Sequence, residues 1–289
     1  MKNDGKIFDI VNYSLLTLIG IIMLFPFVNV VAIAFSSYTG YIQHPFMIFP
    51  HEFNFEGFKY VFNNGLILAS YKNTIIVTIT ATFLSLILIT LTAYSLSKKH
   101  LRGRKIFMNL LIFTMLFNGG LIPNFYLIRS LGWIDSLWAL IIPGALGAYN
   151  VILMKSFFEN LPESLEEAAK IDGASELTIL SKIILPLSMP IIATIALFVA
   201  VGQWNSFFNA VIYIRTPAKW TLQLVLREIL MSANNQLLAS GGDSANINQV
   251  PAETLRYSTL VAVVLPIMCV YPFLQKYFVK GVTLGAVKG

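Results

Sequence analysis

The sequence predicts an all-α membrane protein with about six transmembrane helices, on three observations. The 289 residues are 56% hydrophobic but only 12% charged, whereas soluble domains carry about 25% charged residues. Six mostly apolar segments each reach the roughly 20 residues that a bilayer requires. Apart from basic residues at their ends, these segments contain no Asp, Glu, Lys or Arg. Because backbone groups in hydrocarbon must be hydrogen-bonded within the segment, the runs should be helical.

We expect a single transmembrane domain over residues 1–289. The first apolar segment is longer than the apolar stretch of about 7–15 residues in a cleavable signal peptide, so we expect it to remain as a helix. The helices are expected at about 11–35, 74–97, 106–128, 137–157, 190–214 and 258–278, a cytoplasmic hairpin at 158–189, and external loops at 36–73 and 215–257.

The basic residues predict the orientation of the chain. If the N-terminus is inside, the cytoplasmic segments carry 13 of the 20 Lys and Arg residues, and the longer external loops carry the other 7. The densest cluster lies at 98–105. The positive-inside rule therefore favours cytoplasmic positions for both termini. The same distribution explains the net charge of +6 without a nucleic-acid partner.

Several kinds of chemistry have no support in the sequence. Cys269 is the only cysteine, so neither an intrachain disulfide nor a cysteine metal cluster is expected. There is no Gly-x-x-x-x-Gly-Lys-Ser/Thr phosphate loop, so the chain should not bind ATP itself. The absence of acids and bases within the helices disfavours a proton relay. Sodium coupling through carbonyls and hydroxyls stays open.

The segment 158–189 is the one long segment expected on the cytoplasmic side. Pro162 suits a first helical turn, and the acidic residues after it favour the positive end of a helix. Ser164 and Glu167 have the spacing of a capping box. Gly173 fits the end of this first helix, because a left-handed residue costs little only for glycine.

A second short helix is expected from Ser175 to Leu185, with Pro186 breaking it before the fifth transmembrane helix. In the first helix, Leu165, Ala168 and Ala169 form a short apolar face that another surface could approach closely. From the residues alone, the hairpin either docks into the groove of a partner or only links two transmembrane helices.

The spacing within this hairpin resembles the EAA signature of ABC-importer permeases. The matching residues are Glu167-Ala168-Ala169, Gly173, Ile183 and Leu185-Pro186. The chain is also similar to the carbohydrate branch of that family, typified by the maltose-importer membrane pair, and looks like its six-helix member. This likeness covers most of the chain from about residue 70 onward and is carried by Asn118–Pro123, Lys155–Phe158 and Gln275–Gly281.

The resemblance implies the architecture of a type I ABC importer permease in a bacterial cell membrane. It implies a transport subunit without its own ATPase site, which imports sugars or oligosaccharides by alternating access. The implied partners are a second permease subunit, two ATP-binding subunits that carry the ATP and magnesium, and an external solute-binding protein. This chain would bind no cofactor or metal itself.

The resemblance also implies two sets of contact residues. Those coupling the chain to the ATPase would be Glu166, Glu167, Ala168, Ala169, Asp172 and Gly173. The loop 215–257 would touch the solute-binding protein through Trp220, Gln223 and Arg227, although these three could equally be ordinary anchors of the loop.

A candidate substrate path follows from polar side chains within the apolar segments. Amides there are expensive unless they face a bundle or a cavity, and Asn205 and Asn209, four residues apart, would share one helix face. These side chains either bind a sugar or hydrogen-bond helix to helix. The set is Gln203, Trp204, Asn205, Asn209, Asn118 and Asn150.

The alternative function is a stand-alone secondary carrier or channel for small polar solutes, which would need no ATPase partner. The hairpin signature and the absence of charge within the helices favour the importer subunit. An intramembrane enzyme is disfavoured, because the apolar segments contain neither a metal-binding His pair nor a Ser/His arrangement.

Overall fold

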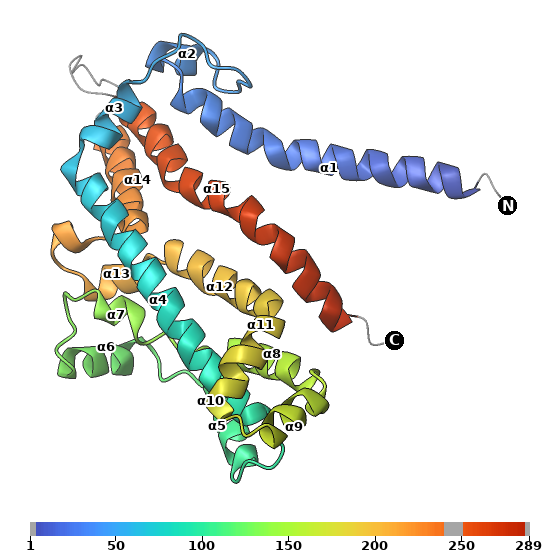
Figure 1. Cartoon of the computed structure of the whole chain (residues 1–289). Helices are drawn as coiled ribbons and strands as arrows, with labels where there is room; N and C mark the ends of the chain where they lie inside the picture. Colours follow the sequence, from blue (N-terminus) through green and yellow to red (C-terminus); the bar gives the residue numbers. More distant parts are fainter. Residues whose placement is uncertain (1–3, 240–250, 287–289) are drawn as a thin grey trace. The chain divides into compact units, whose positions relative to one another are not determined.

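The structure is a computed structural model that describes residues 4–239 and 251–286. Every regular element in these residues is a helix, as Figure 1 illustrates. This confirms the all-α prediction. One isolated antiparallel bridge joins Ser36 to Phe53. The chain divides into two compact units, Met1–Leu68 with Val225–Leu265 and Ala69–Leu224 with Pro266–Gly289.

Three of the described helices are long and apolar enough to cross a bilayer. They are Phe8–Ala34 of α1 (Asp4–Ala34), α4 (Gly65–Ser97) and Glu253–Val270 of α15 (Ala252–Ala286). Up to five spans result if each of two bent helix pairs is one span. The pairs are α5 (Arg104–Leu116) with α6 (Leu121–Ser130), bent by 114°, and Glu176–Leu187 with α12 (Met189–Trp204), bent by 82°.

The segment 106–128, expected as one helix, is divided between α5 and α6. Gly120 has a φ of 90°, which a side chain would oppose, and its N–H donates to Oδ1 of Asn118 over 2.9 Å. The glycine and the local asparagine hydrogen bond therefore end α5 and begin α6 in a new direction.

The segments 137–157 and 190–214 are also divided. The first becomes α7 (Trp138–Ile141) and α8 (Ala148–Glu159), with Pro143, which cannot continue a helical hydrogen-bond ladder, between them. The second becomes α12 and α13 (Phe208–Tyr213). Asn205 follows α12 and donates its side-chain amide to the carbonyl of Val201 over 3.0 Å.

The first unit contains α1, α2 (Tyr38–Gln43), α3 (Glu56–Asn63), most of α14 (Leu222–Ala239) and the first part of α15. Only the end of α1 is packed, where Ala32, Ile33 and Met47 form a buried cluster with Tyr257 of α15 against it. Most of the large apolar side chains of α1 are exposed. A helix that is apolar all round and unpacked along its length suits a lipid environment.

Among the described residues of the second unit, α4 joins two hydrophobic clusters. Val77 and Ala81 belong to the cluster that includes α7 and α13. Ile89 belongs to the other, with residues of α8, α12 and the hairpin. Since a helix rises about 1.5 Å per residue, the clusters lie at different levels along α4.

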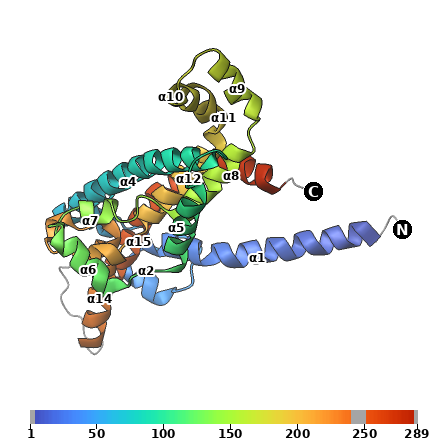
Figure 2. The ribbon, with the colours of Figure 1, turned by 90° about the horizontal axis from the view of Figure 1, so that it is seen from below.

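The hairpin comprises α9 (Glu163–Ile171), α10 (Glu176–Ile179), a π-helical turn (Leu180–Ile184) and α11 (Leu185–Leu187). Figure 2 shows α9, α10 and α11 projecting beyond α8 and α12 within the second unit. The expected hairpin at 158–189 is therefore present as a protruding element between two apolar helices.

Candidate functional site

The first arm of the hairpin begins and ends at defined residues. The residue preceding α9 is Pro162, which has no side-chain cap, so the capping box expected from Ser164 and Glu167 is wrong. The end was predicted correctly, since Gly173 has a φ of 77°. The N–H groups of Gly173 and Ala174 donate to the carbonyls of Lys170 and Ala169 over 3.0 and 2.9 Å. This is the Schellman pattern, which requires a left-handed residue.

The second arm starts where expected but ends later. Ser175 caps α10 by accepting the N–H of Thr178. Pro186 lies inside α11 rather than breaking it, and the chain turns at Ser188. Because Pro186 has no N–H and crowds the carbonyl four residues earlier, the preceding turn opens from α to π geometry, as the N–H of Leu185 bonded to the carbonyl of Leu180 shows.

One side of the hairpin is packed and the other is open. Ala169, Ile179 and Ile184 are buried in the cluster that also contains Met154 of α8. On the open side, Ile171 and Leu177 are 86% and 71% exposed. Ala168, Asp172 and Gly173 are exposed as well. The arms therefore present an apolar and acidic tip on a firmly packed base.

The acidic residues of α9 have different surroundings. Glu166 forms an ion pair with Lys98. Glu163 pairs with Lys99 over 2.6 Å, and the hydrogen bond from this lysine holds the pKa of Glu163 below its usual value. Within the part of the chain that the structure describes, the exposed carboxylate of Glu167 has no ion-pair or hydrogen-bond partner. Glu167 is thus free to contact another molecule, whereas Glu166 is engaged within this chain.

Two of the candidate substrate-path residues, Asn205 and Asn118, make local hydrogen bonds. Asn205 and Asn209 do not share a helix face, because α12 ends at Trp204 and α13 begins at Phe208. The side chain of Asn205 bonds Val201, and Asn118 caps the turn at Gly120. Trp204 is 8% exposed, Gln203 and Asn150 are half-buried, and Asn209 is exposed. Both hydrogen bonds are local. That of Asn118 lies at the turn between α5 and α6, and that of Asn205 lies directly after the end of α12.

The three residues proposed to contact a solute-binding protein are engaged within the chain. Trp220 packs against the cluster of Val77 and Tyr213. The amide of Gln223 reaches Oδ1 of Asn205 over 3.5 Å. The guanidinium Nη1 of Arg227 lies 3.3 Å from the carboxylate Oε1 of Glu228.

The neighbouring segment 215–219 is exposed and held in place by two residues that the sequence reasoning missed. Asp135 accepts hydrogen bonds from the N–H groups of Arg215 and Thr216 over 3.0 and 2.9 Å. The amide of Asn73 donates to the carbonyls of Ala218 and Trp220 over 2.9 and 3.0 Å. These partners are 80 or more residues apart, so no local spacing pattern could have revealed them.

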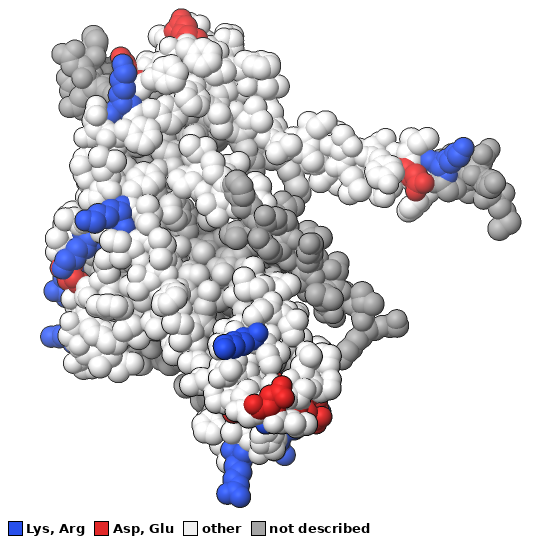
Figure 3. Space-filling model, viewed as in Figure 1, with Lys and Arg blue, Asp and Glu red and all other residues white. Residues whose placement is uncertain are grey.

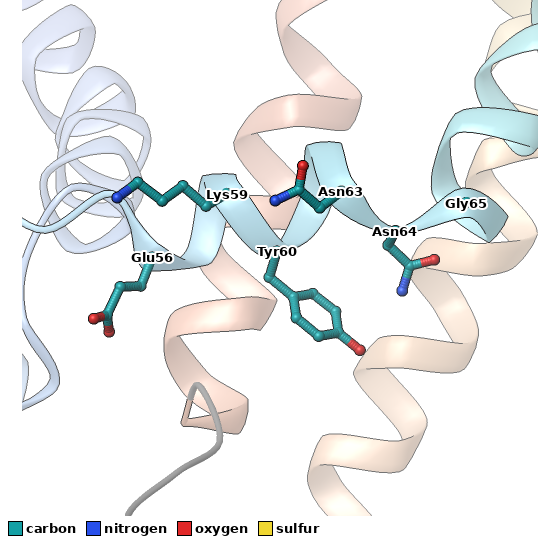
Figure 4. A pocket seen from close by; sticks show the side chains of 6 residues that line it. All are labelled: Glu56, Lys59, Tyr60, Asn63, Asn64 and Gly65. Atoms are coloured by element: carbon teal, nitrogen blue, oxygen red, sulfur yellow. The ribbon is translucent and has the colours of Figure 1, made fainter.

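A shallow opening lies along α3, lined by Glu56, Lys59, Tyr60, Asn63, Asn64 and Gly65. Figure 4 shows the side chains of Tyr60 and Asn64 on one side of α3 and those of Lys59 and Asn63 on the other. Asn64 also caps α4 through the N–H of Leu66 over 2.9 Å. Because the polar groups do not converge, this opening is not a second candidate site.

Comparisons with known proteins place the chain in a family. Residues 65–284 match the model of the family described as "Binding-protein-dependent transport system inner membrane component". Protein LplC of Bacillus subtilis is 44% identical over 99% of this chain and 96% of its own length. The polygalacturonan/rhamnogalacturonan transport system permease protein YtcP of the same organism is 41% identical over 100% of both chains.

A solved structure gives the same assignment. A chain of a bacterial ABC transporter involved in the import of the acidic polysaccharide alginate superposes with a TM-score of 0.86, at 36% identity, over 95% of this chain and 98% of that chain. The family model begins at residue 65, at the start of α4, and includes the whole hairpin. The chain therefore belongs to the family of binding-protein-dependent transport system inner membrane components.

Proposed function

We propose that this chain is the permease subunit of an ATP-driven, binding-protein-dependent importer of sugars or oligosaccharides. Separate ATPase subunits would drive it between outward-facing and inward-facing states by rigid-body movement of helices. The family assignment supports the assignment to binding-protein-dependent transporters. The exposed tip of the hairpin supports the proposal that the ATPase binds there.

The observation that carries the proposal is the exposed tip between α9 and α10. Ile171 and Leu177 are 86% and 71% exposed, at an element that projects beyond α8 and α12 (Figure 2). Large apolar side chains exposed on a projecting element are available for contact with a partner. Glu167 would contact the groove of the ATPase, Ala168 would allow its close approach, and Gly173 would fix the turn.

The assembled importer would contain a second permease subunit, two ATPase subunits and an external solute-binding protein. ATP and magnesium would be held by the ATPase subunits, and this chain would bind no cofactor. It would cross a bacterial cell membrane six times with both termini inside, as the basic residues favour. In this orientation the segment 215–219 is external, and Trp220, Gln223 and Arg227 would position the surface that meets the binding protein.

The names of the relatives guide the choice of solute. YtcP is named for polygalacturonan and rhamnogalacturonan, and the superposed structure is that of an alginate importer. Polygalacturonan and alginate are built from uronic acids, so an acidic oligosaccharide is the first solute to test. Gln203, Asn209 and Asn150 would contribute amide hydrogen bonds along its path, with Trp204 beside them.

The proposal is tested by import into lipid vesicles that contain the assembled complex. We expect a labelled uronate oligosaccharide to accumulate only with ATP and the cognate binding protein. Glu167→Gln should abolish the ATP-driven import. Glu163→Gln should leave the import intact. It makes the same change on the same helix, but at an ion pair whose two side chains are both exposed.

The alternative function predicts a different result. A carrier or channel would move the solute in vesicles that contain only this chain, without nucleotide. Import under that condition would refute the importer proposal.

A further inference from the structure

The hairpin is connected to α8 and α12 by the chain, but its polar contacts lead to the end of α4. The hydroxyl of Tyr94 donates a hydrogen bond to Glu176 of α10 over 2.7 Å. Lys98, directly after α4, forms an ion pair with Glu166 of α9. These partners are 82 and 68 residues apart. One turn at the end of α4 therefore holds both arms of the hairpin.

The four groups form one continuous cluster. The amine of Lys98 lies 4.0 Å from the centroid of the Tyr94 ring, within the range of a cation–π interaction. Lys170 of α9 pairs with Glu176 of α10 over 2.8 Å, which ties the two arms to each other. Figure 3 shows acidic and basic side chains gathered together at this end of the second unit.

Burial distinguishes the Lys98 pair from its neighbour. The side chains of Lys98 and Glu166 are 13% and 23% exposed, whereas those of Lys99 and Glu163 are 75% and 72% exposed. Ion pairs in full contact with water contribute little. Removing one partner of a largely buried pair leaves an unpaired charge away from water, which is strongly unfavourable. The Lys98–Glu166 pair is therefore the firm connection of the two.

The helices differ in their suitability to carry a movement. The second arm meets α12 at 82°, so a push along that arm is not directed along α12. Non-helical residues separate α8 from α7 and α12 from α13. In contrast, α4 is unbroken from Ala69 to Ser97 and carries Val77 and Ala81 into the other hydrophobic cluster. Within the described residues, α4 is thus a continuous helix between the hairpin and that cluster.

We propose that the Lys98–Glu166 pair, seated on Tyr94, transmits movement of the hairpin to α4. Glu166 is then a positioning residue that acts through Lys98 and not a contact to the ATPase. This inference rests on the proposed function, in which an ATPase moves the hairpin. It adds the route by which the movement reaches the transmembrane helices.

The test is a charge exchange in the complete importer, reconstituted in lipid vesicles with its binding protein. The quantity measured is solute imported per ATP hydrolysed. Lys98→Glu and Glu166→Lys should each lower this ratio about tenfold or more, because like charges then face each other. The double exchange Lys98→Glu with Glu166→Lys should restore most of it. A residue that contacted the ATPase directly would not be rescued by changing Lys98.

A matched control uses the exposed pair one residue away. Lys99→Glu and Glu163→Lys should change the ratio by no more than about twofold, as surface pairs do. Tyr94→Phe keeps the ring beneath Lys98 but removes the hydrogen bond to Glu176, and should lower the ratio about threefold. If the charge reversals do not assemble, Glu166→Gln decides the question, because it removes the ion pair with Lys98 without placing like charges together; an unchanged ratio in Glu166→Gln would overturn the inference.

Two further outcomes would overturn the inference. The first is that Lys98→Glu, Glu166→Lys and Tyr94→Phe all leave the ratio of solute imported to ATP hydrolysed unchanged. The second is that the double exchange gives a ratio no higher than that of either single change. Both presuppose a wild-type importer driven by ATP. A wild-type complex that imports nothing with ATP would instead refute the proposed function.

Discussion

Asp135 holds Thr216 by two hydrogen bonds, one from the N–H to Oδ1 over 2.9 Å and one from the hydroxyl to Oδ2 over 2.7 Å. Lys219 adds a third contact to the same carboxylate over 3.0 Å. Asp135 itself has a φ of 59°, a region that Asn, Asp and Gly enter more readily than other residues. A single carboxylate thus joins the loop between α6 and α7 to the segment after α13.

This arrangement predicts how the segment 215–219 responds to pH. The hydrogen bonds from Thr216, and then the one from Lys219, hold the pKa of Asp135 well below its usual value. A carboxyl group with a lowered pKa stabilises the fold above its ordinary pKa of about 4, and this stabilisation is lost only as the pH falls through the lowered value. Protection of the Arg215 and Thr216 amides against hydrogen exchange, corrected for intrinsic rates, should be the same at pH 7 and pH 5.

Asp135→Asn provides the matching variant, since asparagine tolerates the same φ. It removes the charge and one acceptor, so exchange of the two amides should become about tenfold faster. Equal protection in the variant and the wild type would show that the carboxylate does not hold the segment.

Replacing Gly173 tests the turn between the hairpin arms. A Cβ at this position would meet no atom within 4 Å, so the cost of Gly173→Ala comes from the φ of 77° and should be about 1 kcal/mol. The amide of Ala174, which bonds the carbonyl of Ala169, should then exchange about fivefold faster. Gly173→Asn should have a smaller effect. An alanine variant with unchanged exchange would contradict this explanation.

The exposed and buried apolar residues of the hairpin should respond differently to truncation. Ile171→Ala removes a side chain that is 86% exposed, and Ile179→Ala removes one that is 0% exposed. The first should leave the thermal stability of the purified chain unchanged but weaken capture of the ATPase subunits. The second should destabilise the chain by about 2–5 kcal/mol. If Ile171→Ala binds the ATPase as the wild type does, the apolar tip is not the docking surface.

Two glycines of the first unit provide a test of packing between α3 and α15. A Cβ on Gly57 would lie 2.2 Å from Oγ and 2.9 Å from Cβ of Ser258, whereas a Cβ on Gly65 would meet nothing within 4 Å. Gly57→Ala should therefore lower the free energy of unfolding by about 1–3 kcal/mol. Gly65→Ala, at the first residue of α4, should be neutral or slightly stabilising. Similar melting temperatures for the two variants would contradict the close approach of α3 to α15.

The sequence alone determined the class of the protein and the local form of its hairpin. Long runs without charge require helices in a bilayer, and the family assignment agrees with the spacing of Glu167, Gly173 and Pro186. The end of α9 was predictable because the left-handed turn at Gly173 depends on one residue and its immediate neighbours. The six spans and the cytoplasmic termini stay predictions from the distribution of basic residues.

Only the tertiary structure decided which polar groups meet. Glu166 could be placed on α9 from its neighbours, but its partner Lys98 is 68 residues away, and Asp135 and Thr216 are 81 residues apart. Packing of apolar helices brings such residues together, and helix periodicity contains no information about it. The same holds for Asn205 and Asn209. Their spacing predicted a shared helix face, but the helix is interrupted between them. Local sequence therefore fixed the all-α class and the turn at Gly173, while contacts between distant helices decided which acids remain free for a partner.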